Sequence, residues 1–360
     1  MDRPDGPVPD GGVSPALPQP VAAARRAVAE VLPEDGLALV ACSGGADSLA
    51  LAAAAAYHVR RGQARVGGVV VDHGLHPHSA AVTATAAQQL RELGLAPVVI
   101  ECVQVDDRSP DGPEAAARTA RYSAFTRAME STAAQRILLA HTRDDQAEQV
   151  LLGLARGSGT RSVAGIPRRR GPFHRPLLEL SRQDTETICA HAQLTAWDDP
   201  ANSDPALLRS RIRTEILPLL EERLSPAIRQ ALSRTARIAA DDADHLDAEA
   251  QRRFADLLED PDTHGRIRFD LARLEALSPA IRRRVLALAV IAVGGTRPSM
   301  ERLEAAEGLR ARRGSAGPVQ MEGGVQVYRG TTGSPEYGKL VLVPPGAPGP
   351  ADDVGVGGPA

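Results

Sequence analysis

The most constraining feature of this chain is a short glycine-containing run between a strand pattern and a helix pattern. Residues 43–48 read Ser-Gly-Gly-Ala-Asp-Ser, with an apolar stretch at 37–42 before them and an alanine- and leucine-rich stretch at 49–59 after them. Glycines after a strand let backbone N–H groups turn inward without a Cβ clash. The following helix directs its positive N-terminus to the same point. The run therefore predicts a loop that holds a phosphate or a pyrophosphate.

Two common glycine-rich phosphate loops do not fit this run. It contains neither G-x-x-x-x-G-K-[ST] nor G-x-G-x-x-G, which excludes the Walker loop and the dinucleotide fingerprint. The order S-G-G-x-D-S instead resembles the pyrophosphate loop (PP-loop) of ATP pyrophosphatases, enzymes that split ATP into AMP and pyrophosphate. A turn built from small residues is the alternative, and the residue order with these flanks favours the loop.

Strand and helix patterns alternate along the first half of the chain. Strand patterns occupy 66–72, 97–105 and 137–140, and helix patterns occupy 79–93, 114–130 and 144–155. This alternation predicts an α/β fold, a Rossmann-like parallel sheet with helices on both faces. Ligands bind such sheets outside the carboxyl ends of the strands. The phosphate loop, the turn at 72–74 and His141 all fall at such ends.

The second half of the chain is mainly helical. We expect helices at 181–191, at 207–222 with a break at Pro218, at 225–258 and at 278–293. Alternating patterns at 319–328 and 340–344 surround a glycine- and serine-rich turn, which predicts a terminal hairpin. The ends of the chain, 1–20 and 346–360, are rich in proline and glycine and are expected to be disordered tails.

Composition limits the classes of function. A length of 360 residues suggests two domains, and a net charge of −3 excludes a chain that is basic overall. Arginine nevertheless outnumbers acidic residues at 156–182 and at 209–237, so these stretches predict local polyanion sites. Because Lys339 is the only lysine, a general preference for arginine is the alternative explanation.

The cysteines and the apolar stretches predict a cytoplasmic protein that does not enter a membrane. Cys42, Cys102 and Cys189 stand apart, form no C-x-x-C motif and cannot all pair, which fits a reducing compartment. No apolar stretch has the length of a membrane span, and the N-terminal residues lack the pattern of a secretory signal.

Three polar residues at helical spacing form the clearest candidate for chemistry. His141, Asp145 and Glu148 would project from one face of a helix that begins near Thr142. One carboxylate there can bind Mg²⁺ and a second can hold a cationic substrate. A capping box of Thr142 and Asp145 is the alternative, but it does not account for the other two residues. Asp144 is expected to be solvated or to cap the helix.

Arginines and histidines supply weaker candidates. Arg118 and Arg121 are three residues apart and could reach one anion, or could equally form a solvated face. His73, His76 and His78 lie in a loop with glycine and proline, which is a poor zinc signature.

Longer motifs show a resemblance to a known family. From about residue 37 to 220 the chain is similar to bacterial tRNA(Ile)-lysidine synthases, members of the PP-loop superfamily. The blocks that carry the resemblance are S-G-G-A-D-S, V-D-H-G-L-H-P-H-S-A, G-P-E-A-A-A-R-T-A-R-Y, A-H-T-R-D-D-Q-A-E-Q-V-L-L-G-L-A-R-G-S-G, R-P-L-L-E-L-S-R and W-D-D-P-A-N-S-D-P-A-L-L-R-S-R-I-R. His76 stands where we expect arginine, which weakens a phosphate role at that position. Residues 225–345 carry no sharp motif.

The resemblance implies a carbon–nitrogen ligase with ATP and Mg²⁺ as cofactors. In this family ATP adenylates the C2 oxygen of the wobble cytidine of the isoleucine tRNA with a CAU anticodon. The ε-amine of free L-lysine then attacks C2 and releases AMP, which leaves lysidine. The amine must lose a proton before it attacks, so a carboxylate or a histidine is needed nearby.

The resemblance also implies roles for individual residues. Asp47 and Asp145 would hold Mg²⁺, His141 and Arg143 would act near the adenylate, and Glu148 would hold the lysine ammonium. The residues that would bind ATP are Ser43, Gly44, Gly45, Ala46, Asp47, Ser48 and Asp72. Those that would contact lysine or phosphates are Arg118, Arg121, Arg209, Arg211 and Arg213, although the last three cannot all face one way on a helix.

The implied domain organisation is a PP-loop catalytic domain at 21–220 and a helical tRNA-binding domain at 221–345. Asp199 and Asn202 either shape the pocket or cap the next helix. The oligomeric state is left open, with a homodimer as one alternative.

Three rival functions carry less support. A tRNA thiolase needs cysteines for sulfur, and those of this chain stand alone. An amidotransferase needs an ammonia source, and no glutaminase-like segment is evident. A binding protein without catalysis would not need so many acids, Asp47, Asp145 and Glu148, at a polyanion site.

Overall fold

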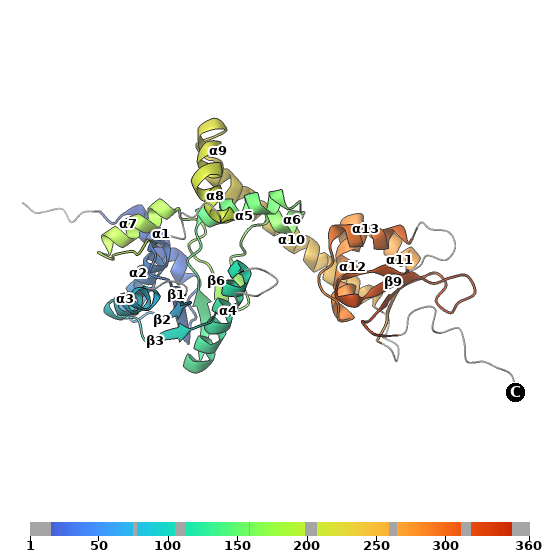
Figure 1. Ribbon diagram of the computed structural model, residues 1–360, viewed down its shortest axis with the longest axis horizontal. Helices are drawn as coiled ribbons and strands as arrows, with labels where there is room; N and C mark the ends of the chain where they lie inside the picture. Colours follow the sequence, from blue (N-terminus) through green and yellow to red (C-terminus); the bar gives the residue numbers. More distant parts are fainter. Residues whose placement is uncertain are drawn as a thin grey trace, which may run out of the picture. The chain divides into compact units, whose positions relative to one another are not determined.

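The computed structural model describes residues 16–74, 78–104, 113–157, 159–198, 207–258, 265–310 and 318–347. The chain divides into two compact units, unit 1 at 1–237 and unit 2 at 238–360 (Figure 1). Both expected tails lie largely outside the described residues, as do His76, Asp199 and Asn202.

Unit 1 is built on a six-stranded sheet with the strand order β3-β2-β1-β4-β6-β5. All neighbouring strands are parallel except the short edge pair β5 and β6. The strands are β1 (Leu37–Cys42), β2 (Arg65–Asp72), β3 (Val98–Cys102), β4 (Ala134–Leu138), β5 (Arg169–Arg170) and β6 (Phe173–His174). The expected parallel α/β sheet is confirmed.

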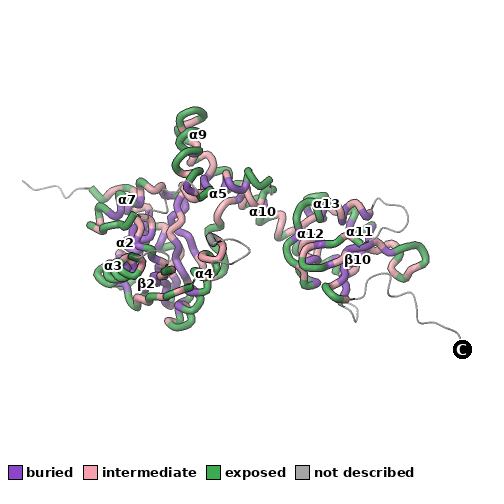
Figure 2. Tube along the Cα trace, viewed as in Figure 1, coloured by how far each residue is buried: buried purple, intermediate pink, exposed green. Residues whose placement is uncertain are grey.

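Helices cover both faces of this sheet. The helices of this part are α1 (Gln19–Ala29), α2 (Ala46–Arg60), α3 (Ser79–Glu92), α4 (Pro113–Thr132), α5 (Arg143–Ala155), α6 (Thr160–Val163) and α7 (Arg182–His191). On β1, Ala38 and Val40 belong to a core shared with α1, α2, α3 and α7, whereas Leu37 and Leu39 belong to a second core with α4. Successive side chains of a strand point to opposite faces, so β1 is buried on both sides (Figure 2).

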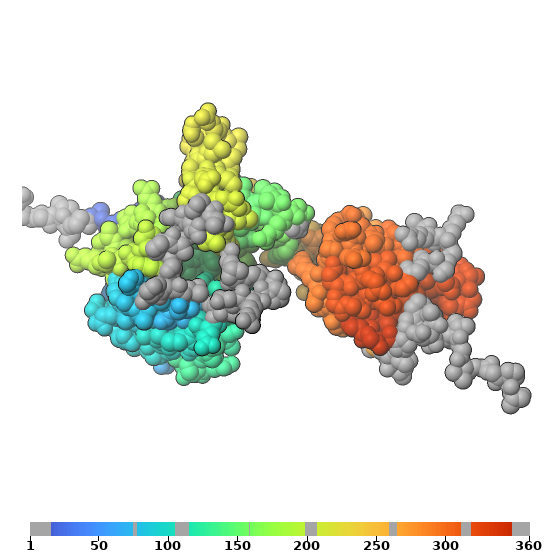
Figure 3. Space-filling view, in the orientation of Figure 1, coloured from blue at the N-terminus to red at the C-terminus, as the bar shows by residue number. Residues whose placement is uncertain are grey.

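A helical segment follows at 208–257. It consists of α8 (Leu208–Arg211), a π-helical turn η2 (Ile212–Ile216), α9 (Leu217–Arg223) and α10 (Ile228–Leu257). The expected interruption near Pro218 is present as the π-helical turn η2, which ends two residues before the proline, and the chain stays helical across it because Ile216 and Leu217 keep right-handed helical dihedrals. Because helical residues precede Pro218, its missing N–H and its ring disturb the hydrogen bonds of the turn before it, which is where η2 lies. The segment at α9 projects from unit 1 (Figure 3).

Unit 2 combines helices with a small antiparallel sheet. Its further helices are α11 (Leu271–Glu275), α12 (Pro279–Ala292), α13 (Met300–Gly308) and the short 3₁₀ turn η3 (Glu322–Gly324). Its strands are β7 (Ile267–Asp270), β8 (Val319–Gln320), β9 (Gln326–Arg329) and β10 (Lys339–Val343), in the order β7-β10-β9-β8. The expected hairpin corresponds to β9 and β10. The strand β7 was not expected, because its alternation covers only four residues.

No helix among the described residues is long and apolar enough to cross a membrane.

Close packing of α5 against α6 predicts opposite effects of one substitution at two helical glycines. A Cβ at Gly153 would lie 2.4 Å from the backbone oxygen of Ser162, whereas a Cβ at Gly308 meets nothing within 4 Å. We expect Gly153→Ala to lower the free energy of unfolding by about 1–3 kcal/mol through overpacking. Gly308→Ala should raise it by up to about 1 kcal/mol. Urea unfolding of both variants measures this, and equal effects would contradict the packing of α5 described here.

Candidate active site

A cavity of about 520 Å³ opens at the carboxyl ends of β1, β2 and β4. We call it the strand-end cavity. Its lining includes Cys42 at the end of β1, Val71 near the end of β2, and Leu139 just after β4. The candidate residues that line it are Ser43, Gly45, Ala46, Asp47, Ser48, Arg118, Arg121, His141, Asp145, Arg209 and Arg213. Most of the candidate residues therefore come together at the sheet edge that was expected.

The phosphate loop has the geometry that its glycines predict. Gly44 has a φ of +85°, a conformation that favours glycine, and α2 begins two residues later at Ala46. The Ser48 hydroxyl donates to the Gly45 carbonyl over 2.9 Å and accepts from the Ser43 amide over 3.2 Å. This hydroxyl ties the two ends of the loop together at the N-terminus of α2, where an anion is favoured.

Asp47 is a carboxylate held in a largely desolvated place. The Thr185 hydroxyl, on α7, donates to its Oδ1 over 2.5 Å. Burial is the largest influence and raises the pKa of Asp47 to about 6; the Thr185 hydrogen bond opposes this and the nearby Asp145 adds to it. Two acids on one wall of the cavity thus repel each other when both are ionised.

Asp145 both caps α5 and faces the cavity. Its Oδ2 accepts the Thr142 amide over 2.7 Å, and the Thr142 hydroxyl accepts the Asp145 amide over 3.5 Å, which completes a capping box. Its Oδ1 lies 3.5 Å from Nη2 of Arg213. Asp145 can therefore cap α5 through Oδ2 and still present Oδ1 for a function in the cavity, so the two interpretations do not exclude each other.

Glu148 differs from the expectation for a lysine contact. Its side chain is fully buried, does not line the cavity, and is bound by Arg213 through Nε at 2.6 Å and Nη2 at 3.2 Å. A buried carboxylate needs such a cationic partner. In this structure the carboxylate of Glu148 is engaged and turned toward Arg213 instead of an open subsite.

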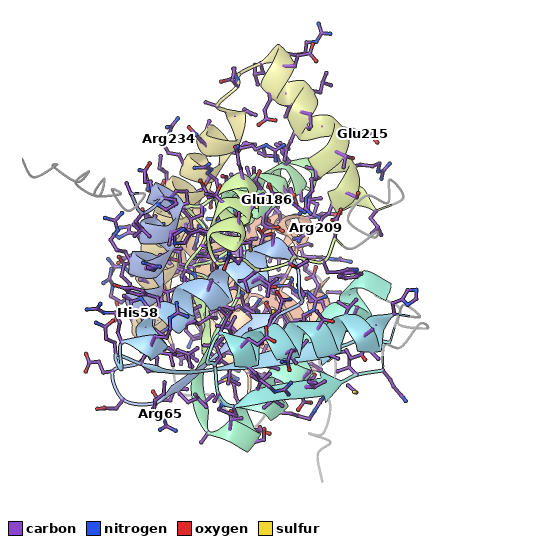
Figure 4. The ribbon with its side chains drawn as sticks, turned by 90° about the vertical axis from the view of Figure 1, so that its left-hand side faces the viewer. His58, Arg65, Glu186, Arg209, Glu215 and Arg234 are labelled. Atoms are coloured by element: carbon purple, nitrogen blue, oxygen red, sulfur yellow. The ribbon has the colours of Figure 1, made fainter. Side chains whose placement is uncertain are left out.

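The arginines of η2 and α8 divide between two faces. Arg209 and Arg213, four residues apart, line the cavity, and Arg209 also donates to Gln149 over 2.7 Å. Arg211 between them is exposed and lies outside the cavity lining, because a helix turns it away. Figure 4 labels Arg209 together with Glu186 of α7 on the side of unit 1 that it shows.

His141 is neutral at pH 7. Burial is the main cause that lowers its pKa, to about 4; Asp145 opposes the shift, and Arg175 is among the arginines that add to it. Its Nδ1 is buried without a hydrogen-bond partner among the described residues. A neutral imidazole in the cavity can accept or donate a proton there.

Two residues with expected roles near ATP do not line the cavity. Arg143 donates from its side chain to the Glu179 carbonyl over 3.3 Å, which directs it away from the site. Asp72 accepts the Gly74 amide over 2.9 Å and the Ser79 hydroxyl, and these hydrogen bonds lower its pKa. Asp72 therefore links the end of β2 to Gly74 and to Ser79, the first residue of α3, which does line the cavity.

Asp144 is neither solvated nor the cap of its own helix. It accepts the Arg182 amide at the start of α7 over 2.9 Å and Nη1 of Arg229 over 2.8 Å. Arg229 also pairs with Glu221 at 2.8 Å. This acid thus joins α5 to α7, α9 and α10.

Sequence reasoning missed several residues of the site. Arg182, Tyr122 and Trp197 line the cavity. Thr185 does not line the cavity, but its hydroxyl donates a hydrogen bond to Asp47. Tyr122 belongs to the motif R-T-A-R-Y and Trp197 to the motif W-D-D-P-A-N. Membership of these motifs could have identified both as site residues. Thr185 lies in an ordinary helix pattern, and nothing local distinguishes it.

Two protein families match this chain. The PP-loop domain family matches residues 21–220, and the TilS substrate binding domain family matches residues 269–332. Similar curated proteins are the tRNA(Ile)-lysidine synthases of Leifsonia xyli (46% identical, covering 90% of this chain and 93% of the relative), Salinispora tropica (45%, 92% and 99%) and Thermobifida fusca (48%, 77% and 84%).

One solved structure has a similar fold. The U34-tRNA thiolase NcsA from Methanococcus maripaludis, with its [4Fe-4S] cluster, aligns with a TM-score of 0.51 over 62% of this chain and 80% of that chain. The two sequences are only 16% identical, so the likeness concerns the fold alone.

Desolvation of Asp47 predicts a pH-dependent cost of folding. Its pKa of about 6 exceeds the ordinary 3.8, so the folded chain binds the extra proton between these values. Stability due to this group is then highest below about pH 4 and decreases as the pH rises through 6. We expect Asp47→Asn, at pH 8 and without divalent ions, to raise the free energy of unfolding by about 1–3 kcal/mol, with the gain vanishing toward pH 4.

Asp72→Asn is the matched control, with the opposite sign. Hydrogen bonds from Ser79 and Gly74 lower the pKa of Asp72, so its contribution to stability is present at neutral pH and lost in acid. Urea unfolding at several pH values measures both variants. A gain for Asp47→Asn that does not change with pH would contradict the desolvated carboxylate.

Proposed function

This chain belongs to the tRNA(Ile)-lysidine synthase family, and we propose that its strand-end cavity is where ATP, a tRNA base and lysine meet. The chain is an ATP-dependent ligase of tRNA modification that forms lysidine on the wobble cytidine of the CAU-anticodon isoleucine tRNA. We further propose that it works in the cytoplasm, where tRNA, ATP and lysine are available together.

One observation carries the assignment of the cavity: a phosphate loop, two acids and several arginines converge on it. A ring carbonyl is a poor electrophile, and adenylation turns its oxygen into a good leaving group. The phosphate loop would hold the β- and γ-phosphates at the N-terminus of α2. Arg118, Arg121 and Arg209 would then offset the charge that develops on the phosphates.

The donor set of the cavity fits Mg²⁺. Asp47 and Asp145 face the same space, and their mutual repulsion is part of what raises the pKa of Asp47. A divalent cation would relieve this repulsion, and carboxylate oxygens are the ligands that Mg²⁺ prefers. No group of three or more His, Cys, Asp or Glu side chains suited to a metal occurs among the described residues. This fits a cation that shares its ligands with substrate phosphates, whose charge it neutralises when bound.

His141 is our proposed acceptor for the amine proton. The attacking ε-amine of lysine must be neutral, and the imidazole of His141 is neutral and lines the cavity. Burial lowers the pKa of His141 to about 4, so the imidazole is a weak base in the empty cavity, although Asp145 opposes this shift. Phosphates that neutralise the nearby arginines would raise the pKa of His141 toward the range in which it can take the proton. A second group with suitable chemistry is Asp47, but as a metal ligand it would stay ionised.

Lysine binding at Glu148 would require Arg213 to change partners. Arg213 now binds Glu148 and lies 3.5 Å from Asp145. A phosphate of ATP would offer its guanidinium another anion, and the ammonium of lysine would then replace it at the buried carboxylate. We retain Glu148 as the proposed lysine contact on this condition.

Labelled lysine tests the proposed reaction directly. With ATP and Mg²⁺, we expect the label to enter a CAU-anticodon isoleucine transcript and not the methionine transcript with the same anticodon. Filter-bound radioactivity measures it, and release of AMP and pyrophosphate should match the lysine incorporated. ATP turnover without label in either transcript would leave the phosphate loop assigned and the lysine step wrong.

Two neighbouring arginines provide a matched test of the cavity. Arg213→Lys keeps the charge but loses the bidentate geometry, so we expect kcat/KM for lysine ligation to decrease roughly 10- to 100-fold. Arg211→Lys, on the exposed face of the same helix, should leave kcat/KM for lysine ligation unchanged. Thermal unfolding of both variants checks that they fold. Equal decreases in kcat/KM for the two variants would show that a position in the cavity lining is not what makes Arg213 important for the reaction.

A further inference from the structure

Trp197 is a large aromatic side chain at the cavity without an assigned role. It is the only tryptophan of the chain, and it lines the strand-end cavity with 36% of its surface exposed. It belongs to none of the apolar clusters formed by the described residues. An indole that packs into no core and faces a binding site is available for a ligand.

The backbone that carries Trp197 is hydrogen-bonded at Thr195 and at Trp197 itself. Gln89 of α3 exchanges two hydrogen bonds with the backbone of Thr195, at 3.2 and 3.3 Å. The Trp197 amide donates to the Gly44 carbonyl over 2.9 Å, and Asp198 lies 4.0 Å from Nη2 of Arg182. The backbone that carries the indole is therefore fixed by hydrogen bonds before a ligand arrives. Little conformational entropy of the protein is then lost when a ligand contacts the ring.

The anchoring places Trp197 against the phosphate loop. A Cβ built on Gly44 would lie 4.0 Å from the Cβ of Trp197, and one on Gly45 would lie 3.8 Å from its carbonyl oxygen. A flat ring stacked on the indole would thus lie close to the phosphates held by the loop. Adenylation requires the base that is modified to be at that place.

The exposure of Trp197 favours the tRNA base over the adenine of ATP. A base attached to a macromolecule must enter through the part of the cavity that is open to solvent, and Trp197 is among the exposed groups of the lining. An adenine is separated from the phosphates by its ribose. The buried apolar lining of Val70 and Leu139 suits it better.

We propose that Trp197 is the stacking surface on which the wobble cytosine rests during adenylation, a proposal that rests on the proposed function above. Enzymes that modify a base take it out of the stack and hold it against aromatic side chains. Stacking tolerates every base, so Trp197 holds the base without choosing it. The backbone hydrogen bonds of Thr195 and Trp197 hold the segment that carries the indole.

The single tryptophan makes a direct test possible, because all indole fluorescence of the full-length protein comes from Trp197. We expect the CAU-anticodon isoleucine transcript, added without ATP, to quench this fluorescence. The same transcript with an abasic wobble nucleotide should bind through its backbone and leave the fluorescence nearly unchanged. Equal quenching by both transcripts would overturn the proposal.

Kinetics of two variants give an independent measurement. Trp197→Ala should raise the KM for the tRNA roughly 5- to 100-fold, the loss expected for one base–aromatic stack, with the KM for ATP unchanged. Trp197→Phe keeps a stacking face and should retain most of the affinity. A rise confined to the KM for ATP would instead assign the indole to adenine and overturn the proposal.

The two proposals fail in different ways. If labelled lysine does not enter the transcript but the wobble-dependent quenching is observed, the reaction is wrong and the stacking surface stands. If lysine is incorporated and Trp197→Ala behaves like the unaltered protein, the reaction stands and the stacking surface is wrong.

Discussion

One buried acid of α5, Glu148, and one partly buried acid, Asp144, have cationic partners that come from the helical segment after residue 207. Glu148 is bound by Arg213 at 2.6 Å, and Asp144 by Arg229 at 2.8 Å. Removing one member of such a pair leaves an uncompensated buried charge, which costs far more than the intact pair contributes. These contacts therefore hold η2 and the start of α10 against the α/β sheet. The same contacts set the position of two cavity arginines, because Arg209 and Arg213 belong to that segment.

The cavity brings together acidic and basic side chains, and placing either kind there alone would be energetically unfavourable. Asp47 and Asp145 repel each other, and burial, followed by the nearby arginines, lowers the pKa of His141. Bound phosphates and a divalent cation would satisfy both sets of charges together. An arrangement that is costly without its ligands and balanced with them is typical of a catalytic site. Thr185 and the capping box at Thr142 hold the two acids in this arrangement.

Much of the fold followed from periodicity and turn chemistry. The alternation of patterns at 37–155 predicted a parallel sheet, and the structure has it. The prediction of secondary structure failed where the local sequence signal was too short. β7 spans four residues, too few for a clear alternation, and it forms because β10 offers it a free edge. The interruption expected at Pro218 is present as the π-helical turn at 212–216, because a proline disturbs the turn that precedes it.

The order of neighbouring residues was sufficient to predict the phosphate loop and the sheet edge where ligands bind, and to identify the resemblance to a family. Each of these depends on residues that are close together in the chain. The choice among candidate side chains needed the folded chain. Arg213 meets Glu148 across 65 positions, and Thr185 meets Asp47 across 138. No local pattern encodes such pairs, since they arise when distant elements bury polar groups against each other. That burial separated Arg213 from Arg211, turned Glu148 and Arg143 away from the cavity, and brought Trp197 beside the phosphate loop.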